Sequence, residues 1–413
     1  MKISQYKLKN GTECLTILDN DCPSVTTTIL VRTGSRYENK SNSGIAHLIE
    51  HMTFKGTKQR KTSRDIANDI ELLGGHMNAF TGHEYTGFYL KAPKQNFNMV
   101  LEVLADIFKN SIIPQVELNK EKRVIIEEIK MYEDIPMEKV QDLYLGKLFS
   151  NHPLGQNIAG SEKSLKSILR EDCLDFIDKY FTKQNIVIVV AGGFCEEEIV
   201  NNLDKHFTEN DKVNHPSIYE KALIRKLNNK YYKVNKNIEQ SHIVSGGFLG
   251  PRNTTTRLPI LIGNIILSGG FGSKLFQKIR EDLGLAYYIN LNVHQFTDIG
   301  FYSINMGVDH TKKQFAIEEV NKVIKQFLNG NITSTELKRA KNYLIGNLST
   351  NLETSEELAN WYGIRYLLDK DVILLDSFIK EIENIKIDDI LNEWSKYFNK
   401  ENTLTMVLGK KII

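Results

Sequence analysis

Cysteine is scarce in this 413-residue sequence, and no cysteine spacing typical of a metal site occurs. Cys14, Cys22, Cys173 and Cys195 include no C-x-x-C pair, so we expect four free thiols in a reducing compartment. No apolar run of about 18 residues is present, and the N-terminal segment MKISQYKLKNG has no apolar centre. These absences predict a cytoplasmic protein without a membrane-spanning helix or a secretory signal peptide.

The chain also lacks an excess of charge of either sign. Its 53 lysines and arginines against 51 aspartates and glutamates leave a formal charge of +2. No overall field would attract nucleic acid or an anionic membrane, so we expect neither partner. A composition of 41% hydrophobic and 25% charged residues with only 8 prolines is typical of a folded globular protein, and the length suggests two or three domains.

The sequence repeats itself once. The segment KYFTKQN at 179–185 is echoed by KYFNKEN at 396–402, and each runs into a β-like stretch that ends in glycine. The offset is constant at 217 residues, as for Asn185 and Asn402 or for Asp172 and Asp389. Because chance recurrence of a helix-to-strand junction would not keep one register, we predict two homologous halves, 1–217 and 218–413, joined by a polar segment at 208–233.

Strand and helix patterns occur in blocks within each half rather than in strict alternation. Such blocks predict an α+β fold in which each half has a mainly antiparallel sheet with helices packed on one face. Expected strands are 25–34, 86–92, 185–193, 238–250, 286–292, 300–308 and 402–410. Expected helices are 44–54, 63–73, 96–110, 116–134, 164–180, 258–267 and 273–281.

The first half contains the motif H-x-x-E-H at His47, Glu50 and His51. On a helix, positions i and i+4 share a face, so the two imidazoles can bind one ion. A catalytic zinc normally has three protein ligands, and this motif is the inverted form of the H-E-x-x-H zinc signature. The alternative is a helix with two solvated histidines, but three such residues seldom share a helix that must bury one face.

A third ligand is expected among the acidic residues of VELNKEKRVIIEEIKMYED. Glu121 and Glu128 are seven residues apart and share a helix face, whereas Glu127 is rotated by about 100° from Glu128. Helical periodicity alone does not choose among them. His76 and His83, in the polar stretch GGHMNAFTGHEYT, are further imidazoles, although histidines in such a segment more often face solvent or substrate.

The segments HLIEHMTFKGT, GGHMNAFTGHEYT and EKRVIIEEI resemble peptidase family M16, the pitrilysin and mitochondrial-processing-peptidase group. In that family the third zinc ligand follows the second histidine after 76 residues, which here selects Glu128, and Glu121 takes the place of a supporting glutamate. When the halves are aligned, Asn347 lies opposite Glu128 and Ala340 opposite Glu121. The resemblance therefore implies one Zn²⁺ per chain, in the first half.

The resemblance also assigns residues outside the zinc motif. The segment SKLFQKIREDLGLAYYI is similar to the family segment whose arginine and tyrosine support the substrate carbonyl, here Arg280 and Tyr287. Without the family, this segment is an ordinary helix end with Gly284 as its C-cap. The family also binds its peptide substrate along an Asn-Ala-x-Thr strand, which here is Asn78, Ala79, Phe80 and Thr81.

The resemblance implies a zinc endopeptidase of the short M16B type, with Glu50 as the general base. Family members of this length resemble half of a clamshell, and two chains enclose short or unfolded peptides in one chamber. A homodimer, or a heterodimer with a related chain, is therefore expected. The alternative is a non-catalytic or partner-dependent subunit of a processing peptidase, since the same fold also serves as a scaffold.

Overall fold

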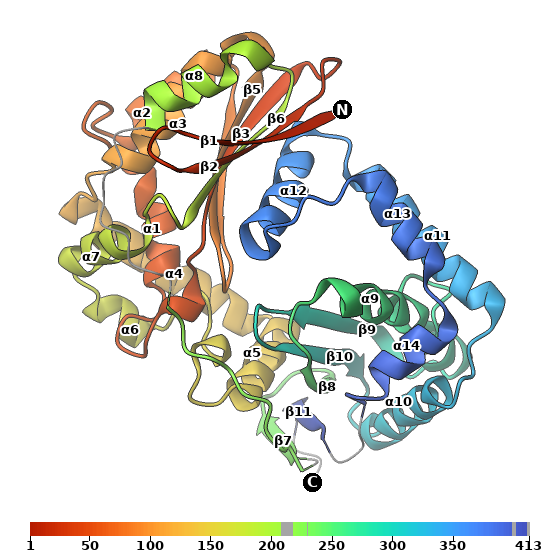
Figure 1. Ribbon diagram of the computed structural model, residues 1–413. Helices are drawn as coiled ribbons and strands as arrows, with labels where there is room; N and C mark the ends of the chain where they lie inside the picture. The colour runs from red at the N-terminus through yellow and green to blue at the C-terminus, as the bar shows by residue number, and fades with distance from the viewer. Residues whose placement is uncertain (208–217, 229, 399–401, 411–413) are drawn as a thin grey trace. The chain divides into compact units, whose positions relative to one another are not determined.

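The computed structural model describes residues 1–207, 218–228, 230–398 and 402–410 (Figure 1). The chain forms two compact units, each with one mixed sheet and packed helices, which confirms the α+β class. Unit 1 comprises 1–130, 156–220 and 351–372, and unit 2 comprises the remaining segments. All four cysteines are free.

The sheet of unit 1 has six strands in the order β1-β2-β6-β3-β5-β4. Only the β2–β6 pair is parallel, so the sheet is mainly antiparallel, as predicted. β4 lies at one edge of the sheet, next to β5. The strands are β1 Lys2–Lys7, β2 Glu13–Leu18, β3 Ser24–Val31, β4 His76–Thr81, β5 Thr86–Pro93 and β6 Ile186–Gly192.

Helices cover both faces of this sheet, and the larger core lies on the face that carries the predicted metal motif. There, apolar side chains of the strands pack against helices from the first half of the chain. These are α1 Ile45–Thr53, α2 Ser63–Leu72, α3 Phe97–Asn110, α4 Gln115–Asp134, α6 Glu162–Ser167, α7 Arg170–Tyr180 and α8 Glu196–Phe207. The opposite face is covered by α12, Ser355–Asp369, which belongs to the second half (Figure 1). Burial on both faces explains why every residue of β6 is buried.

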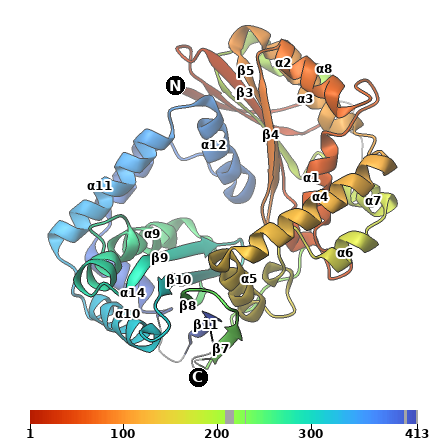
Figure 2. The same ribbon diagram turned by 180° about the vertical axis from the view of Figure 1, so that it is seen from behind.

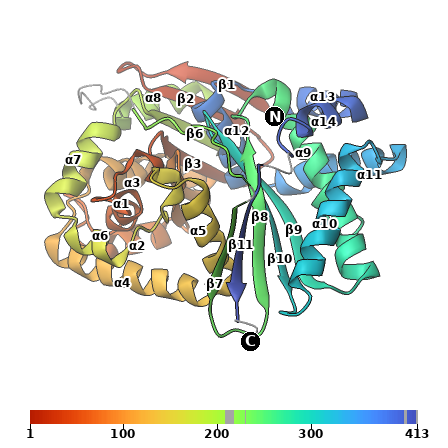
Figure 3. The same cartoon turned by 90° about the horizontal axis from the view of Figure 1, so that it is seen from below.

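The sheet of unit 2 has five strands in the order β7-β11-β8-β10-β9 (Figure 3). Here too a single pair, β7–β11, is parallel. The strands are β7 Lys230–Asn235, β8 Ser241–Leu249, β9 Ala286–Gln295, β10 Gly300–Val308 and β11 Leu404–Gly409. The helices are α5 Pro136–Leu148, α9 Thr254–Ser268, α10 Lys313–Leu328, α11 Ser334–Asn351, α13 Leu375–Asn384 and α14 Ile387–Trp394, with a π-helix at Phe276–Asp282.

The five strands of the unit 2 sheet repeat the order of five of the six strands in unit 1, all except β1. In unit 1 the parallel pair aligns Glu13 with Val187, and in unit 2 it aligns Lys230 with Leu404, so both strands are displaced by the same 217 residues. The sequence repeat therefore corresponds to a repeated fold. Residues 399–401 of the second repeat segment lie outside the described residues.

Several expected elements differ from the structure. The helix expected at 164–180 is two helices, because Ile168 and Leu169 are extended and the Asp172 carboxylate accepts a hydrogen bond from the Leu169 N–H (2.7 Å), which caps α7. The linker expected to reach residue 233 ends earlier, since β7 begins at Lys230. Residues 208–217 of that linker lie outside the described part of the chain.

The compact units are not continuous in sequence. Residues 131–155, with α5, cluster with unit 2, and residues 351–372, with α12, cluster with unit 1. The expected boundary at residue 218 stays a prediction about the sequence repeat. Among the described residues, no helix combines the length and the apolar character needed to cross a membrane.

Candidate metal centre

Helix α1 carries the H-x-x-E-H motif, and packing of its apolar face fixes how the motif is presented. Six of its nine residues are buried. They are Ile45, Ala46, Leu48, Ile49, Met52 and Thr53. With that face in the core, His47, Glu50 and His51 lie on the remaining, half-buried side.

The start of α1 is held by Glu38, which no sequence pattern singles out. One carboxylate oxygen of Glu38 accepts the Gly44 N–H (2.8 Å), and the other accepts the Ala46 N–H (2.9 Å). These are N–H groups that the helix itself leaves without partners. Burial raises the pKa of Glu38 to about 8, against the opposing effect of the two backbone hydrogen bonds.

Gly44 is required at the same place for a second reason. Its φ of 93° lies in the left-handed region, and a Cβ there would approach the Ala159 carbonyl oxygen to 2.5 Å. The turn that leads into the motif is therefore fixed by both Glu38 and Gly44.

We expect Glu38→Ala to lower the free energy of unfolding by roughly 2–4 kcal/mol, because it removes a helix cap and leaves two buried N–H groups unsatisfied. Chemical denaturation measures this loss. Glu38→Gln, which retains one acceptor oxygen, should lose less. Equal stability of Glu38→Ala and the wild type would contradict the capping role.

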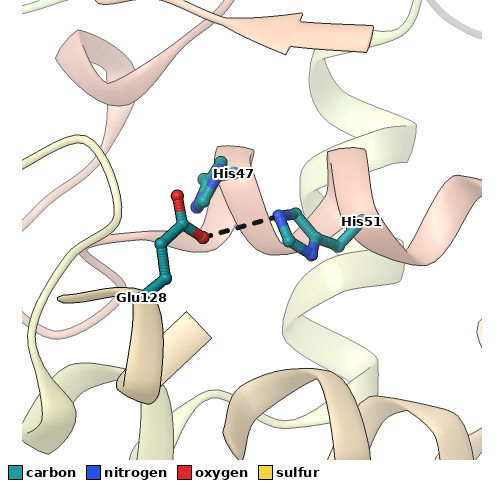
Figure 4. A group of neighbouring side chains, drawn as sticks. All are labelled: His47, His51 and Glu128. Carbon is teal, nitrogen blue, oxygen red and sulfur yellow. Dashed lines mark ion pairs between the residues drawn. The ribbon is translucent and has the colours of Figure 1, made fainter. Parts of the chain in front are cut away.

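Three side chains converge at the exposed side of α1 (Figure 4). One candidate ligand atom each from His47, His51 and Glu128 lies within 4.8 Å of the other two. The His51 Nε2 and Glu128 Oε2 atoms are 3.9 Å apart, and the two imidazole ring centres are 4.6 Å apart. Glu128 comes from α4, which lies beside α1 in both ribbon views (Figures 1 and 2). Within the described ranges, this is the one such group of histidine, cysteine and acidic residues.

Glu121 lies on the same face of α4 as Glu128 and contacts His51 at the ring nitrogen Nδ1. The His51 Nδ1 atom lies 3.1 Å from Glu121 Oε2, and the Lys55 ammonium lies 2.7 Å from the other oxygen of Glu121. Although burial raises the pKa of Glu121, the hydrogen bonds from Lys55 and His51 hold it below its usual value. An ionised Glu121 accepts the Nδ1 proton of His51, which leaves Nε2 with its lone pair toward Glu128.

The electrostatics favour neutral imidazole at His47. Burial and the neighbouring His51 lower the pKa of His47 to about 4, so its ring carries no charge near neutral pH. The buried His47 Nδ1 has no hydrogen-bond partner in the described part of the chain. Neutral imidazoles and a carboxylate are the donors that Zn²⁺ prefers, so this donor set fits a zinc ion.

Glu50 lies between the two histidines in sequence but makes a different contact. One of its oxygens, Oε2, accepts a hydrogen bond from the Thr81 hydroxyl of β4. Burial raises the pKa of Glu50, an effect opposed by Thr81 and His51 and supported by Glu128. The edge strand β4 is thereby joined to the helix that carries the motif.

The four residues of the expected substrate strand all lie in β4, on alternating faces. Ala79 packs against the core on the α1 side and Thr81 bonds to Glu50, whereas the Phe80 ring packs over Gly87 on the face that α12 covers. The Asn78 side chain accepts the N–H of Ala79 (2.8 Å).

Other candidates from the sequence lie outside this group. His83 Nδ1 is hydrogen-bonded to the Ser35 hydroxyl (2.8 Å), and the His76 ring packs on Tyr89. Glu127 forms a surface ion pair with Lys130 (2.7 Å). None of the three belongs to the metal-type group found among the described residues.

Arg280 and Tyr287 lie in unit 2. Arg280 is in the π-helix, and its guanidinium carbon is 4.9 Å from the centre of the Phe276 ring and 5.7 Å from that of Tyr287. Tyr287, at the start of β9, is 74% exposed. Arg280 and Tyr287 therefore lie close enough for a cation–π contact within this unit.

Comparison with known proteins identifies the family of the chain. Residues 15–162 match the family described as Insulinase (Peptidase family M16), and residues 167–344 match the Peptidase M16 inactive domain. An uncharacterized zinc protease of Rickettsia felis is 34% identical over 97% of this chain and 96% of its own. The mitochondrial-processing peptidase subunit beta of Mus musculus is 29% identical over 91% of this chain and 78% of its own.

The fold has a solved counterpart. The structure of a peptidase M16 inactive domain from Pseudomonas fluorescens superimposes with a TM-score of 0.93 at 18% identity and covers 100% of this chain and 99% of its own. At that identity it shows the fold alone. The family matches and the full-length similarity to a zinc protease together show that this chain belongs to peptidase family M16.

Proposed function

We propose that the protein is a zinc-dependent endopeptidase that hydrolyses short or unfolded peptides. The observation that carries the proposal is the convergence of His47, His51 and Glu128 beside a buried Glu50. These three side chains would hold one zinc ion per chain. When bound, zinc acts as a Lewis acid on the scissile carbonyl and makes a water molecule acidic enough to attack it at neutral pH.

Glu50 is the proposed proton carrier. Its Oε2 atom accepts the Thr81 hydroxyl, so Oε1 is the atom available to take a proton from the attacking water and pass it to the leaving amine. Burial raises the pKa of Glu50, which brings it closer to the operating pH, as proton transfer in both directions requires.

The proposed substrate site is the edge of β4. An extended peptide can add to an edge strand through backbone hydrogen bonds, and such pairing tolerates many sequences. Thr81 ends this strand at Glu50, so a peptide along Asn78, Ala79, Phe80 and Thr81 would run toward the proposed base.

Arg280 and Tyr287 are the proposed donors to the oxyanion that forms on the substrate carbonyl, contributed by the same chain or by a second chain. We expect Tyr287→Phe to lower kcat by roughly 10²–10³-fold with unchanged zinc content, because one donor to the developing charge is lost. Tyr288→Phe, at a neighbour whose hydroxyl bonds His242 (2.9 Å), is the matched control and should retain activity. A loss below tenfold in Tyr287→Phe would exclude Tyr287 as a donor to the oxyanion.

The proposed assembly is a homodimer or a heterodimer with a related chain. An alternative role as a partner-dependent subunit is supported by the similarity to the mouse protein, which is named as a subunit. Mass measurement of the protein expressed alone, together with its activity, separates the two. An active homodimer favours the first, and activity that requires a second, different chain favours the alternative.

The function is tested by incubating the protein with a library of unstructured peptides and identifying products by mass spectrometry, with and without a zinc chelator. We expect internal cleavages that disappear with the chelator and return on addition of zinc. Cleavage that is unaffected by complete zinc removal, or none from the zinc-loaded protein alone or with related chains, would overturn the proposal.

A further inference from the structure

Unit 2 contains a cavity of about 720 Å³ between α10 and the sheet. Its volume is in the range of pockets that bind small organic molecules. Strands β7, β8, β10 and β11 form one wall, and α10 forms the other. The lining residues that matter here are Tyr231, Ser245, Tyr302, Ile304, Lys325 and Thr405.

In unit 1, the residues at the strand positions that correspond to the cavity wall belong to the hydrophobic core. In unit 1, Cys14, Ile188, Ile29 and Phe88 lie side by side across four strands, and all four are fully buried in the apolar core. The corresponding row in unit 2 is Tyr231, Thr405, Ser245 and Ile304.

Three of these four matched positions carry a hydroxyl in unit 2 where unit 1 has a thiol or an apolar side chain. The Ser245 and Thr405 hydroxyls lie 2.9 Å apart and hydrogen-bond to each other. Tyr231 is 50% exposed and Ser245 and Thr405 are half-buried, so this wall is not closed over by core side chains as its counterpart in unit 1 is. An accessible wall that combines apolar surface with a few polar groups is typical of a pocket that binds small molecules.

A buried hydroxyl and an exposed lysine also line the cavity. Tyr302 is 1% exposed, and its hydroxyl has no hydrogen-bond partner among the described residues. Both lysines of α10 that line the cavity are exposed: Lys322 is ion-paired with Glu319 (2.5 Å), whereas Lys325 has no ion pair in the described part of the chain. The one carboxylate among the lining residues, Glu318, accepts a hydrogen bond from Gln314 (3.0 Å). Ile324, Leu328 and Phe398 supply an apolar surface.

We propose that this cavity is a binding site for a small amphipathic carboxylate. The apolar chain of the ligand lies along Ile304 and Ile324, and its carboxylate pairs with the Lys325 ammonium. The proposal is independent of the peptidase activity, since it uses no residue assigned to that reaction.

The chain provides its own reporter for this site. It has two tryptophans, and Trp394 stacks on Phe398 of the cavity with ring centres 4.6 Å apart. In a Trp361→Phe background, fluorescence therefore reports Trp394 alone. The probe is decanoate, titrated well below its micelle concentration, and decanol is the uncharged comparison.

We expect a saturable change of Trp394 fluorescence with decanoate and roughly tenfold weaker binding of decanol. Lys325→Glu should weaken decanoate binding by roughly tenfold or more, since a hydrogen bond to a charged group is lost. Lys338→Glu, an exposed lysine of α11 outside the cavity, is the matched charge control and should bind normally. No saturable response, or a response equal in Lys325→Glu and Lys338→Glu, would overturn the proposal.

Discussion

Glu50→Gln is expected to leave the zinc content of the protein unchanged while peptide cleavage falls by roughly 10²–10⁴-fold, the range for loss of a general base. Glutamine keeps the shape of the side chain and the hydrogen bond from the Thr81 hydroxyl, but its amide cannot take a proton from water. Steady-state cleavage of a quenched fluorescent peptide measures the activity, and metal analysis of the same sample measures zinc.

The matched control is Glu127→Gln on α4. Glu127 is exposed and forms an ion pair with Lys130 at the surface, so its replacement changes charge without touching the site. This variant should cleave like the wild type. If Glu50→Gln loses zinc while remaining folded, Glu50 is a metal ligand rather than the base.

A graded effect on zinc affinity is expected along α4. Glu128→Gln should weaken zinc binding by more than about 100-fold, because a proposed ligand is lost. Glu121→Gln should weaken it by roughly 10–100-fold, because Glu121 acts only through His51. Glu127→Gln should have no effect. Competition with a fluorescent chelator measures all three affinities.

The order of these three effects is the discriminating result. Helical periodicity places Glu121 and Glu128 on one face and cannot rank them. In the structure, Glu128 approaches His51 Nε2, whereas Glu121 contacts Nδ1 and Lys55. A larger loss in Glu121→Gln than in Glu128→Gln would exchange their roles.

The fold could be predicted from the sequence where local pattern and tertiary context agree. The apolar run of β6 and the repeat around it predict two related α+β halves, and five strands have the same order in both sheets. The strands β1, β2 and β7 are not among the expected strands, because each has only six residues, and β1 and β7 are rich in lysine and other polar residues. Local sequence patterns also do not predict that α12 covers the sheet of unit 1, because that helix comes from the other half of the chain.

At the site, the sequence identifies the candidate metal ligands better than the residues that hold them in position. The spacing of His47 and His51 on a helix predicts that they lie together, and they do. Glu128 was selected among three glutamates only through the resemblance to the family. The sequence does not predict the roles of Glu38 and Lys55. Neither the helix cap nine residues before His47 nor the ion pair of Lys55 with Glu121 produces a periodic pattern in the sequence.

The proposed metal site is tested by measuring the zinc content of the folded protein with native mass spectrometry. The wild type is compared with a triple variant, His47→Ala, His51→Ala and Glu128→Gln, whose circular dichroism must match. We expect one zinc ion per wild-type chain and none in the variant. One zinc ion per chain in both proteins would contradict this expectation.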